Sequence, residues 1–120
     1  MELCYRFGFD AAHRFEHFSP GHPNARVHGH SFQAEISVAG EPDAGTGFVV
    51  DFAQLESACG AVRMQLDHTM LNEIQDLASP SLENLCLWMW KRLAAEFPAL
   101  TRVTVRRDSA GQSCTYSGPG

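Results

Sequence analysis

Two stretches of alternating hydrophobicity constrain this chain most, because they predict a pair of strands near its start. Apolar residues occupy every second position from residue 3 to residue 9, and again from residue 32 to residue 38. A period of two places the apolar side chains on one face of a strand. Residues 16–27, between the two stretches, contain two prolines and a glycine and are typical of a loop. If the strands pair antiparallel across this loop, the end of the first lies beside the start of the second.

The rest of the chain predicts two helices and then two further strands. Apolar residues recur at three- and four-residue steps from residue 52 to residue 66, directly after a plausible N-cap, Asp51. A second such stripe starts near residues 80–81 and continues to residue 93. Val103 and Val105 suggest a third strand, and residues 114–117 a short fourth. The order ββααββ predicts the α+β class, with two helices on one face of a four-stranded antiparallel sheet.

Composition restricts the partners and the compartment. Nine basic and fourteen acidic residues give a formal net charge of −5, which argues against nucleic acid or an anionic membrane as the main partner. The chain contains no apolar run of membrane-spanning length, and its first residues do not resemble a signal peptide. We therefore expect a cytoplasmic protein. We also expect residues 1–120 to form a single domain, and the open edges of so small a sheet to favour a homo-oligomer.

The histidines predict a metal site at the hairpin. Five of the six lie between residues 13 and 30. His28 and His30 are two residues apart, so a strand would direct both to one side, and His13 ends the partner strand. Three nitrogen ligands with an open fourth position are typical of catalytic zinc. An H-x-H pair alone is more typical of two polar surface residues, so this prediction depends on His13.

The remaining histidines and the cysteines are less informative. His17 and His22 lie in the loop and are expected to be solvated or to face a substrate. Asp67 next to His68 can orient an imidazole for acid–base chemistry, although an aspartate that ends a helix beside an exposed histidine has the same pattern. The four cysteines are scattered without a C-x-x-C pair, which suggests neither a zinc knuckle nor a disulfide framework.

Six short motifs occur together and in order. They are FDAAHR at residues 9–14, HGHS at 28–31, GFVVDF at 47–52, LDH at 66–68, LNE at 71–73 and PSLEN at 80–84. From about residue 5 to residue 116 the chain resembles the 6-pyruvoyltetrahydropterin synthase family. It most resembles the bacterial 6-carboxytetrahydropterin synthase branch, which acts in queuosine biosynthesis.

The resemblance implies a fold, an assembly and a reaction. The fold is the tunnelling fold, in which the sheets of several subunits join edge to edge, and the assembly is a homohexamer built as a dimer of trimers. The reaction is a zinc-dependent lyase reaction on 7,8-dihydroneopterin triphosphate. The implied site residues are His13, His28 and His30 for zinc, Asp67 and His68 for proton transfer, and Ser81 and Glu83 for substrate binding.

Two departures from the family pattern leave the reaction open. Asn24 occupies the loop position where family enzymes have a proton-accepting cysteine, and an amide does not take up a proton near neutral pH. His22 is the substitute base that this loop offers. Arg107 replaces a glutamate that binds the amino-pyrimidine edge of the pterin, and Asp108 can replace that glutamate only through a bulge or a register shift. Three functions remain: the usual synthase with a different base, an enzyme with another substrate, and a zinc- and ligand-binding protein without the synthase reaction.

Overall fold

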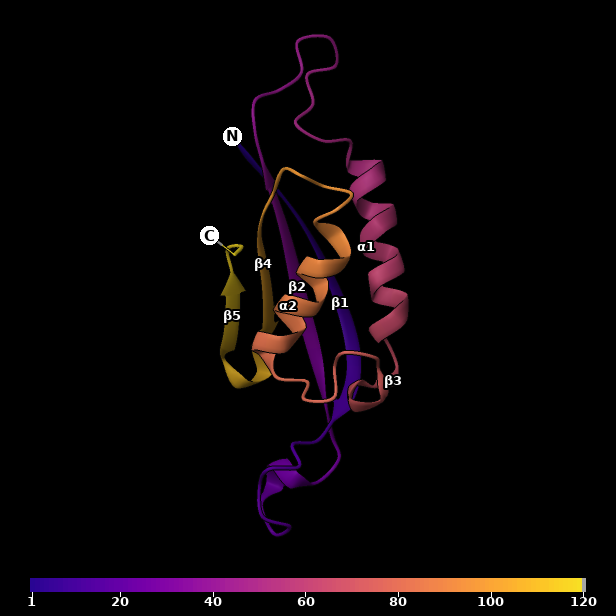
Figure 1. Ribbon diagram of the computed structural model, residues 1–120, viewed down its shortest axis with the longest axis vertical. Helices are drawn as coiled ribbons and strands as arrows, with labels where there is room; N and C mark the ends of the chain where they lie inside the picture. The colour runs from indigo at the N-terminus through magenta and orange to yellow at the C-terminus, as the bar shows by residue number, and fades with distance from the viewer. Residues whose placement is uncertain (120) are drawn as a thin grey trace.

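A long antiparallel hairpin of β1 (Glu2–His13) and β2 (His28–Ala39) forms the centre of the computed structural model, which describes residues 1–119 (Figure 1). The strands pair without a slip from Glu2 opposite Ala39 to His13 opposite His28. The predicted hairpin is therefore confirmed. Each strand is longer than its apolar alternation suggested, because pairing continues through the histidines to the start of the loop.

The sheet has five strands in the order β3-β1-β2-β4-β5. Strands β4 (Leu100–Arg107) and β5 (Gln112–Tyr116) extend it antiparallel on one side. On the other side, β3 (Thr69–Met70) pairs parallel with β1. The α+β class is confirmed, but the sheet is mixed and five-stranded where the sequence predicts four antiparallel strands. Two residues are too few to show an alternation, so β3 left no detectable pattern.

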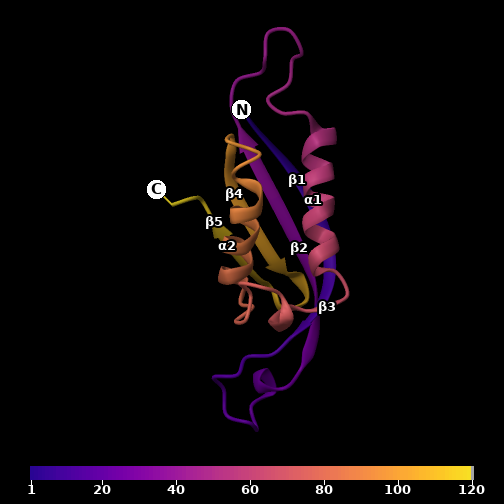
Figure 2. The same ribbon diagram turned by 45° about the vertical axis from the view of Figure 1, so that its right-hand side comes forward.

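Two helices cover one face of the sheet (Figures 1 and 2). Helix α1 (Phe52–Leu66) packs on β1, and α2 (Leu82–Leu93) packs on β4 and β5. Their N-caps are Asp51, whose side chain accepts from the Ala53 N–H, and Ser81, whose hydroxyl accepts from the Asn84 N–H. The core between helices and sheet contains, among others, Phe9, Phe32, Ile36, Leu55, Leu66, Leu85, Met89 and Val103.

The molecule is elongated, with extents of 59 × 27 × 26 Å. The loop at residues 14–27, which contains the short 3₁₀ helix η1 (Pro23–Ala25), projects beyond the helices at one end (Figure 2). We call this segment the hairpin loop. In the described chain, no helix has both the length and the apolar character that crossing a membrane requires. The histidine-rich part of the sequence thus lies at one end of the molecule.

Candidate metal centre

The hairpin register brings three histidines together. His13 lies directly opposite His28, and His30 follows two residues later on the same strand. The ring centroids are 4.6 Å apart for His13 and His28, 4.9 Å for His13 and His30, and 5.0 Å for His28 and His30. One ring nitrogen from each lies within 4.8 Å of the other two. We call these three residues the histidine triad.

Backbone carbonyls orient two of the triad rings. The Nδ1 of His13 is 3.2 Å from the carbonyl oxygen of Pro80, and the Nδ1 of His28 is 2.8 Å from that of Arg26. A carbonyl only accepts, so in neutral rings both Nδ1 atoms carry the proton and both Nε2 atoms offer a lone pair. This is the usual outer contact of a metal-ligating histidine.

Buried nitrogens without partners mark where a cation fits. The Nε2 atoms of His13 and His30 are buried and have no hydrogen-bond partner. A buried polar atom without a partner costs free energy unless another group satisfies it. Three neutral imidazoles without a nearby thiolate suit Zn²⁺ with one position left open. The triad residues therefore fit the metal that the sequence predicts.

Burial and nearby charges favour the neutral form of two triad histidines, His13 and His30. Burial is the main cause that lowers the pKa of His13 to about 4, and the neighbouring His28, His30 and Arg107 lower it further against the opposing bond to Pro80. Burial, followed by Arg107, also lowers the pKa of His30. Metal ligation needs unprotonated imidazoles, so these shifts favour the ligand form.

Asp67 and His68 form a second polar cluster, next to Asp10 of β1. One carboxylate oxygen of Asp67 accepts from the Asp10 N–H at 2.9 Å, and the other lies 3.0 Å from Arg63 and 3.7 Å from the Nε2 of His68. The bond from Asp10 is the main cause that lowers the pKa of Asp67. His68 has a φ of 58° and an exposed ring. An open cavity of about 610 Å³ is lined by both His68 and His30.

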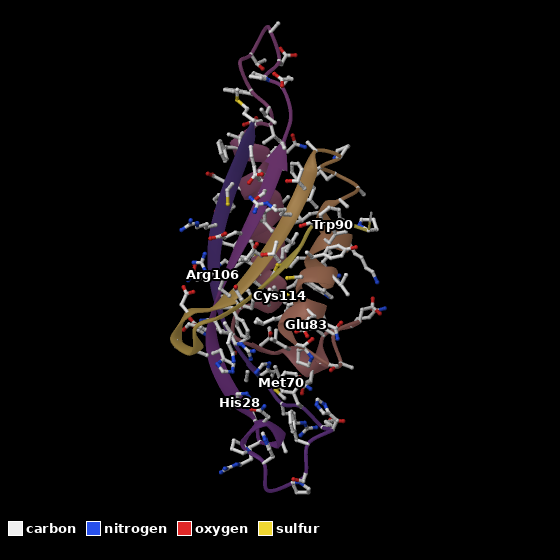
Figure 3. All side chains as sticks on the ribbon, turned by 90° about the vertical axis from the view of Figure 1, so that its left-hand side faces the viewer. His28, Met70, Glu83, Trp90, Arg106 and Cys114 are labelled. Carbon is white, nitrogen blue, oxygen red and sulfur yellow. The ribbon has the colours of Figure 1, made fainter. Side chains whose placement is uncertain are left out.

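A smaller cavity of about 220 Å³ lies between the hairpin loop and the start of α2. We call it the side pocket. Its lining residues are Phe15, His17, Phe18, Asn24, Ser81, Leu82, Glu83 and Arg107. The fold thus brings together Ser81 and Glu83 with both positions that depart from the family pattern, Asn24 and Arg107. In the view of Figure 3, Glu83, Met70 and His28 all lie in the half of the molecule that ends in the hairpin loop.

Two residues predicted from the sequence do not line the side pocket. The ring of His22 stacks on Phe18 with centroids 4.2 Å apart, and its Nδ1 accepts from the Asn24 N–H at 3.1 Å. Asp108 lies 3.0 Å from the Nε of Arg106. Alternation along β4 directs Arg106 and Arg107 to opposite faces, so the carboxylate of Asp108 pairs on the face away from the triad.

Sequence reasoning gave no role to three groups that position the site. The Pro80 carbonyl holds His13. Asn72 accepts from the Arg14 N–H at 3.0 Å and donates to the Arg14 carbonyl at 2.9 Å, which fixes the chain just after His13. Asn84 donates to the Ser79 carbonyl at 2.8 Å, which fixes the segment that carries Pro80. The LNE and PSLEN motifs were the available signal, but their contacts to β1 depend on the tertiary fold.

The family model described as "6-pyruvoyl tetrahydropterin synthase" matches residues 2–119. The chain belongs to this family. A dihydroneopterin monophosphate aldolase of Pyrococcus furiosus is 37% identical over 98 residues, which are 80% of this chain and 77% of that protein. A 6-carboxy-5,6,7,8-tetrahydropterin synthase of Synechocystis is 35% identical over 112 residues, covering 88% and 85% of the two chains. Family membership makes this chain a relative of pterin enzymes with differently named reactions.

The structural comparison agrees with the sequence comparison. The structure of Caenorhabditis elegans 6-pyruvoyl tetrahydropterin synthase superimposes with a TM-score of 0.87 and 25% identity. The match covers 99% of this chain and 96% of that one. The subunit fold that the motifs imply is therefore confirmed.

Proposed function

We propose that this protein is a zinc-dependent lyase that acts on the hydroxylated side chain of a dihydropterin, 7,8-dihydroneopterin triphosphate or a related phosphate ester. The observation that carries the proposal is the histidine triad, in which the buried Nε2 atoms of His13 and His30 have no hydrogen-bond partner among residues 1–119. His13, His28 and His30 would hold the metal. When bound, zinc supplies a Lewis acid that polarises a substrate oxygen.

The chain's own residues supply proton transfer. Asp67 is anchored by the Asp10 N–H and Arg63, so its carboxylate is a fixed acceptor beside the exposed ring of His68. The present 3.7 Å separation is longer than a hydrogen bond, and such contacts tighten when substrate binds. In this proposal, Asp67 orients His68, and His68 exchanges a proton with the substrate side chain.

The missing loop thiol leaves the first proton removal to an imidazole. Asn24 lines the side pocket, and its amide takes up no proton near neutral pH. We assign the step to His68, with His22 as the second candidate once its Nδ1 is released from the Asn24 N–H. Turnover in the His68→Ala and His22→Ala variants discriminates between them, because only the variant that lacks the base loses the chemical step.

The experiment distinguishes the two reactions that the relatives' names give, an aldolase reaction and a synthase reaction. A synthase and an aldolase both break bonds in a pterin side chain but release different products. Zinc-loaded protein is incubated with 7,8-dihydroneopterin triphosphate, and acetaldehyde, carboxypterin, triphosphate and cleaved pterin are followed by chromatography. We expect turnover that is lost in His28→Ala.

Binding of pterin without turnover would contradict the proposed activity. Absence of turnover at high protein concentration, together with tight pterin binding, would contradict the lyase proposal. It would support the alternative of a zinc- and ligand-binding protein without synthase activity. The replacement of both the thiol and the glutamate by Asn24 and Arg107 is the observation that favours this alternative.

We further propose a cytoplasmic homohexamer, a dimer of trimers, in which Asp67 and His68 serve the triad of a neighbouring subunit. The two edge strands support this, since the outer edges of β3 and β5 have no strand beside them within the described chain. The exposed ring of His68 is also free to reach another subunit. Sedimentation equilibrium measures the assembly: a mass of six chains is expected, and a monomer would contradict the proposal.

A further inference from the structure

Arg107 lines the side pocket. Its Nε is buried and makes no hydrogen bond to any of residues 1–119. Burial lowers the pKa of Arg107, and Glu83 across the pocket is near enough to oppose that shift in part. Yet none of the ion pairs within residues 1–119 joins the two side chains. The pocket therefore presents a donor group and an acceptor group that do not satisfy each other.

The neighbouring Arg106, unlike Arg107, has acidic partners within the fold. Arg106 contacts Glu35 and lies 3.0 Å from Asp108, so its guanidinium is paired. Figure 3 shows Arg106 on the side of the sheet away from Glu83. One residue of difference along β4 separates a guanidinium used in the fold from one that is available to a ligand.

Apart from Arg107 and Glu83, the side pocket has three apolar and three polar lining residues. The apolar ones are Phe15, Phe18 and Leu82, and the polar ones are His17, Asn24 and Ser81. Aromatic faces accept flat rings, and a cavity of about 220 Å³ is smaller than the ~300–1,000 Å³ of sites for drug-sized ligands. The lining therefore suits a small planar ring, with polar recognition at its edge.

We propose that the side pocket binds the lactam edge of a planar heterocycle, where Arg107 donates to the ring carbonyl and Glu83 accepts from the adjacent N–H. A guanidinium has only donors and a carboxylate only acceptors, so the pair complements a C=O beside an N–H. The inference rests on the proposed function, since it names how the ring of that substrate is held. Arg107 is then a specificity-determining residue that turns the ring carbonyl toward β4.

A free anion is the competing occupant. Arg107 alone would attract phosphate or carboxylate, but the carboxylate of Glu83 in the same small cavity repels both. The combination of lining residues therefore favours the heterocycle.

Equilibrium binding with a matched pair of probes tests this. Zinc-loaded protein is titrated with pterin, which has the lactam edge, and with 2,4-diaminopteridine, in which an amino group and an unprotonated ring nitrogen replace it. We expect wild type to bind pterin about 10- to 100-fold more tightly, as for loss of a hydrogen bond to a charged group. Arg107→Met should remove this preference, Glu83→Gln should weaken pterin binding, and Arg106→Met should leave both affinities unchanged.

Three results would overturn the inference. The first is equal or tighter binding of 2,4-diaminopteridine by wild type, and the second is an undiminished preference in Arg107→Met. The third is that inorganic phosphate competes with pterin in wild type but not in Arg107→Met, which would make the pocket an anion site. Binding is measured without turnover, so an inactive protein that still prefers pterin would contradict the lyase proposal and support this one.

Discussion

The histidines at the loop end of the hairpin form two groups with opposite surroundings. His13, His28 and His30 belong to paired strands, and carbonyls from Pro80 and Arg26 orient two of their rings. His17 and His22 belong to the hairpin loop, are exposed, and contact Phe18 by ring stacking. The same residue type is thus a preorganised ligand on a strand and an adaptable polar group on a loop. Sites on rigid elements hold a metal with the geometry it needs, and loops are free to follow a substrate.

The largest expected effect separates the two groups by metal content. His28→Ala removes one of three ligands, so the purified protein should fall from about one zinc per chain to almost none. His28 is a better target than His13 because His13 is fully buried. Atomic absorption on metal-reconstituted protein measures the content.

Arg26→Ala is the matched control for this change. His28 uses the backbone carbonyl of Arg26, which the substitution keeps, so this variant should retain its zinc. Equal zinc content in His28→Ala and wild type would show that the histidine triad is not the ligand set.

Asp67→Asn should produce the next largest effect. The amide oxygen still accepts from the Asp10 N–H, so the fold is kept while the charge beside His68 is lost. We expect kcat on the dihydropterin substrate to fall by about 10²–10⁴-fold, the usual contribution of acid–base catalysis, with KM and zinc content unchanged. Steady-state kinetics measure the effect; a variant with wild-type kcat would remove Asp67 from the mechanism.

Asn72→Ala tests how the fold positions His13 of the histidine triad. The substitution removes both bonds to the Arg14 backbone just after His13. We expect zinc affinity to fall about 10- to 100-fold, as for other contacts that orient metal ligands. The free energy of unfolding should fall by about 1–3 kcal/mol. Competition with a chelator measures the first and urea denaturation the second; lost stability with undiminished zinc affinity would limit Asn72 to a structural role.

The smallest effect on zinc affinity is expected for the two histidines of the hairpin loop, His17 and His22. His17→Gln and His22→Gln should each change zinc affinity by no more than about twofold, as for surface substitutions. The same chelator competition applies. A tenfold loss in either variant would mean that the loop moves a histidine onto the metal, and the contrast between the two groups would fail.

The sequence predicted the scaffold better than the chemistry. Alternation located β1 and β2, and with them the meeting of His13, His28 and His30, because a hairpin register determines which residues are opposite. The N-cap Asp51 was likewise visible from the local sequence, whereas the capping role of Ser81 emerged only in the structure. By contrast β3, the Pro80 carbonyl on His13 and the clamp by Asn72 depend on segments far apart in the chain, which no local pattern encodes.

The two arginines of β4 show the same limit. The family resemblance places Arg107 at the position of the missing glutamate, but it does not show what either arginine contacts. The structure pairs Arg106 with Glu35 and Asp108 and places Arg107 in the side pocket. Asp108 was considered as a replacement for the missing glutamate. In the structure its carboxylate is paired with Arg106, and Glu83 provides the acceptor next to Arg107.

X-ray absorption spectroscopy at the zinc edge tests the central claim most directly, because it reports the ligand atoms themselves. For the zinc-loaded protein the histidine triad predicts a first shell of three imidazole nitrogens at about 2.0–2.1 Å with one further oxygen and no sulfur. A zinc–sulfur distance of about 2.3 Å, or fewer than three imidazoles, would contradict the assignment of the metal to His13, His28 and His30.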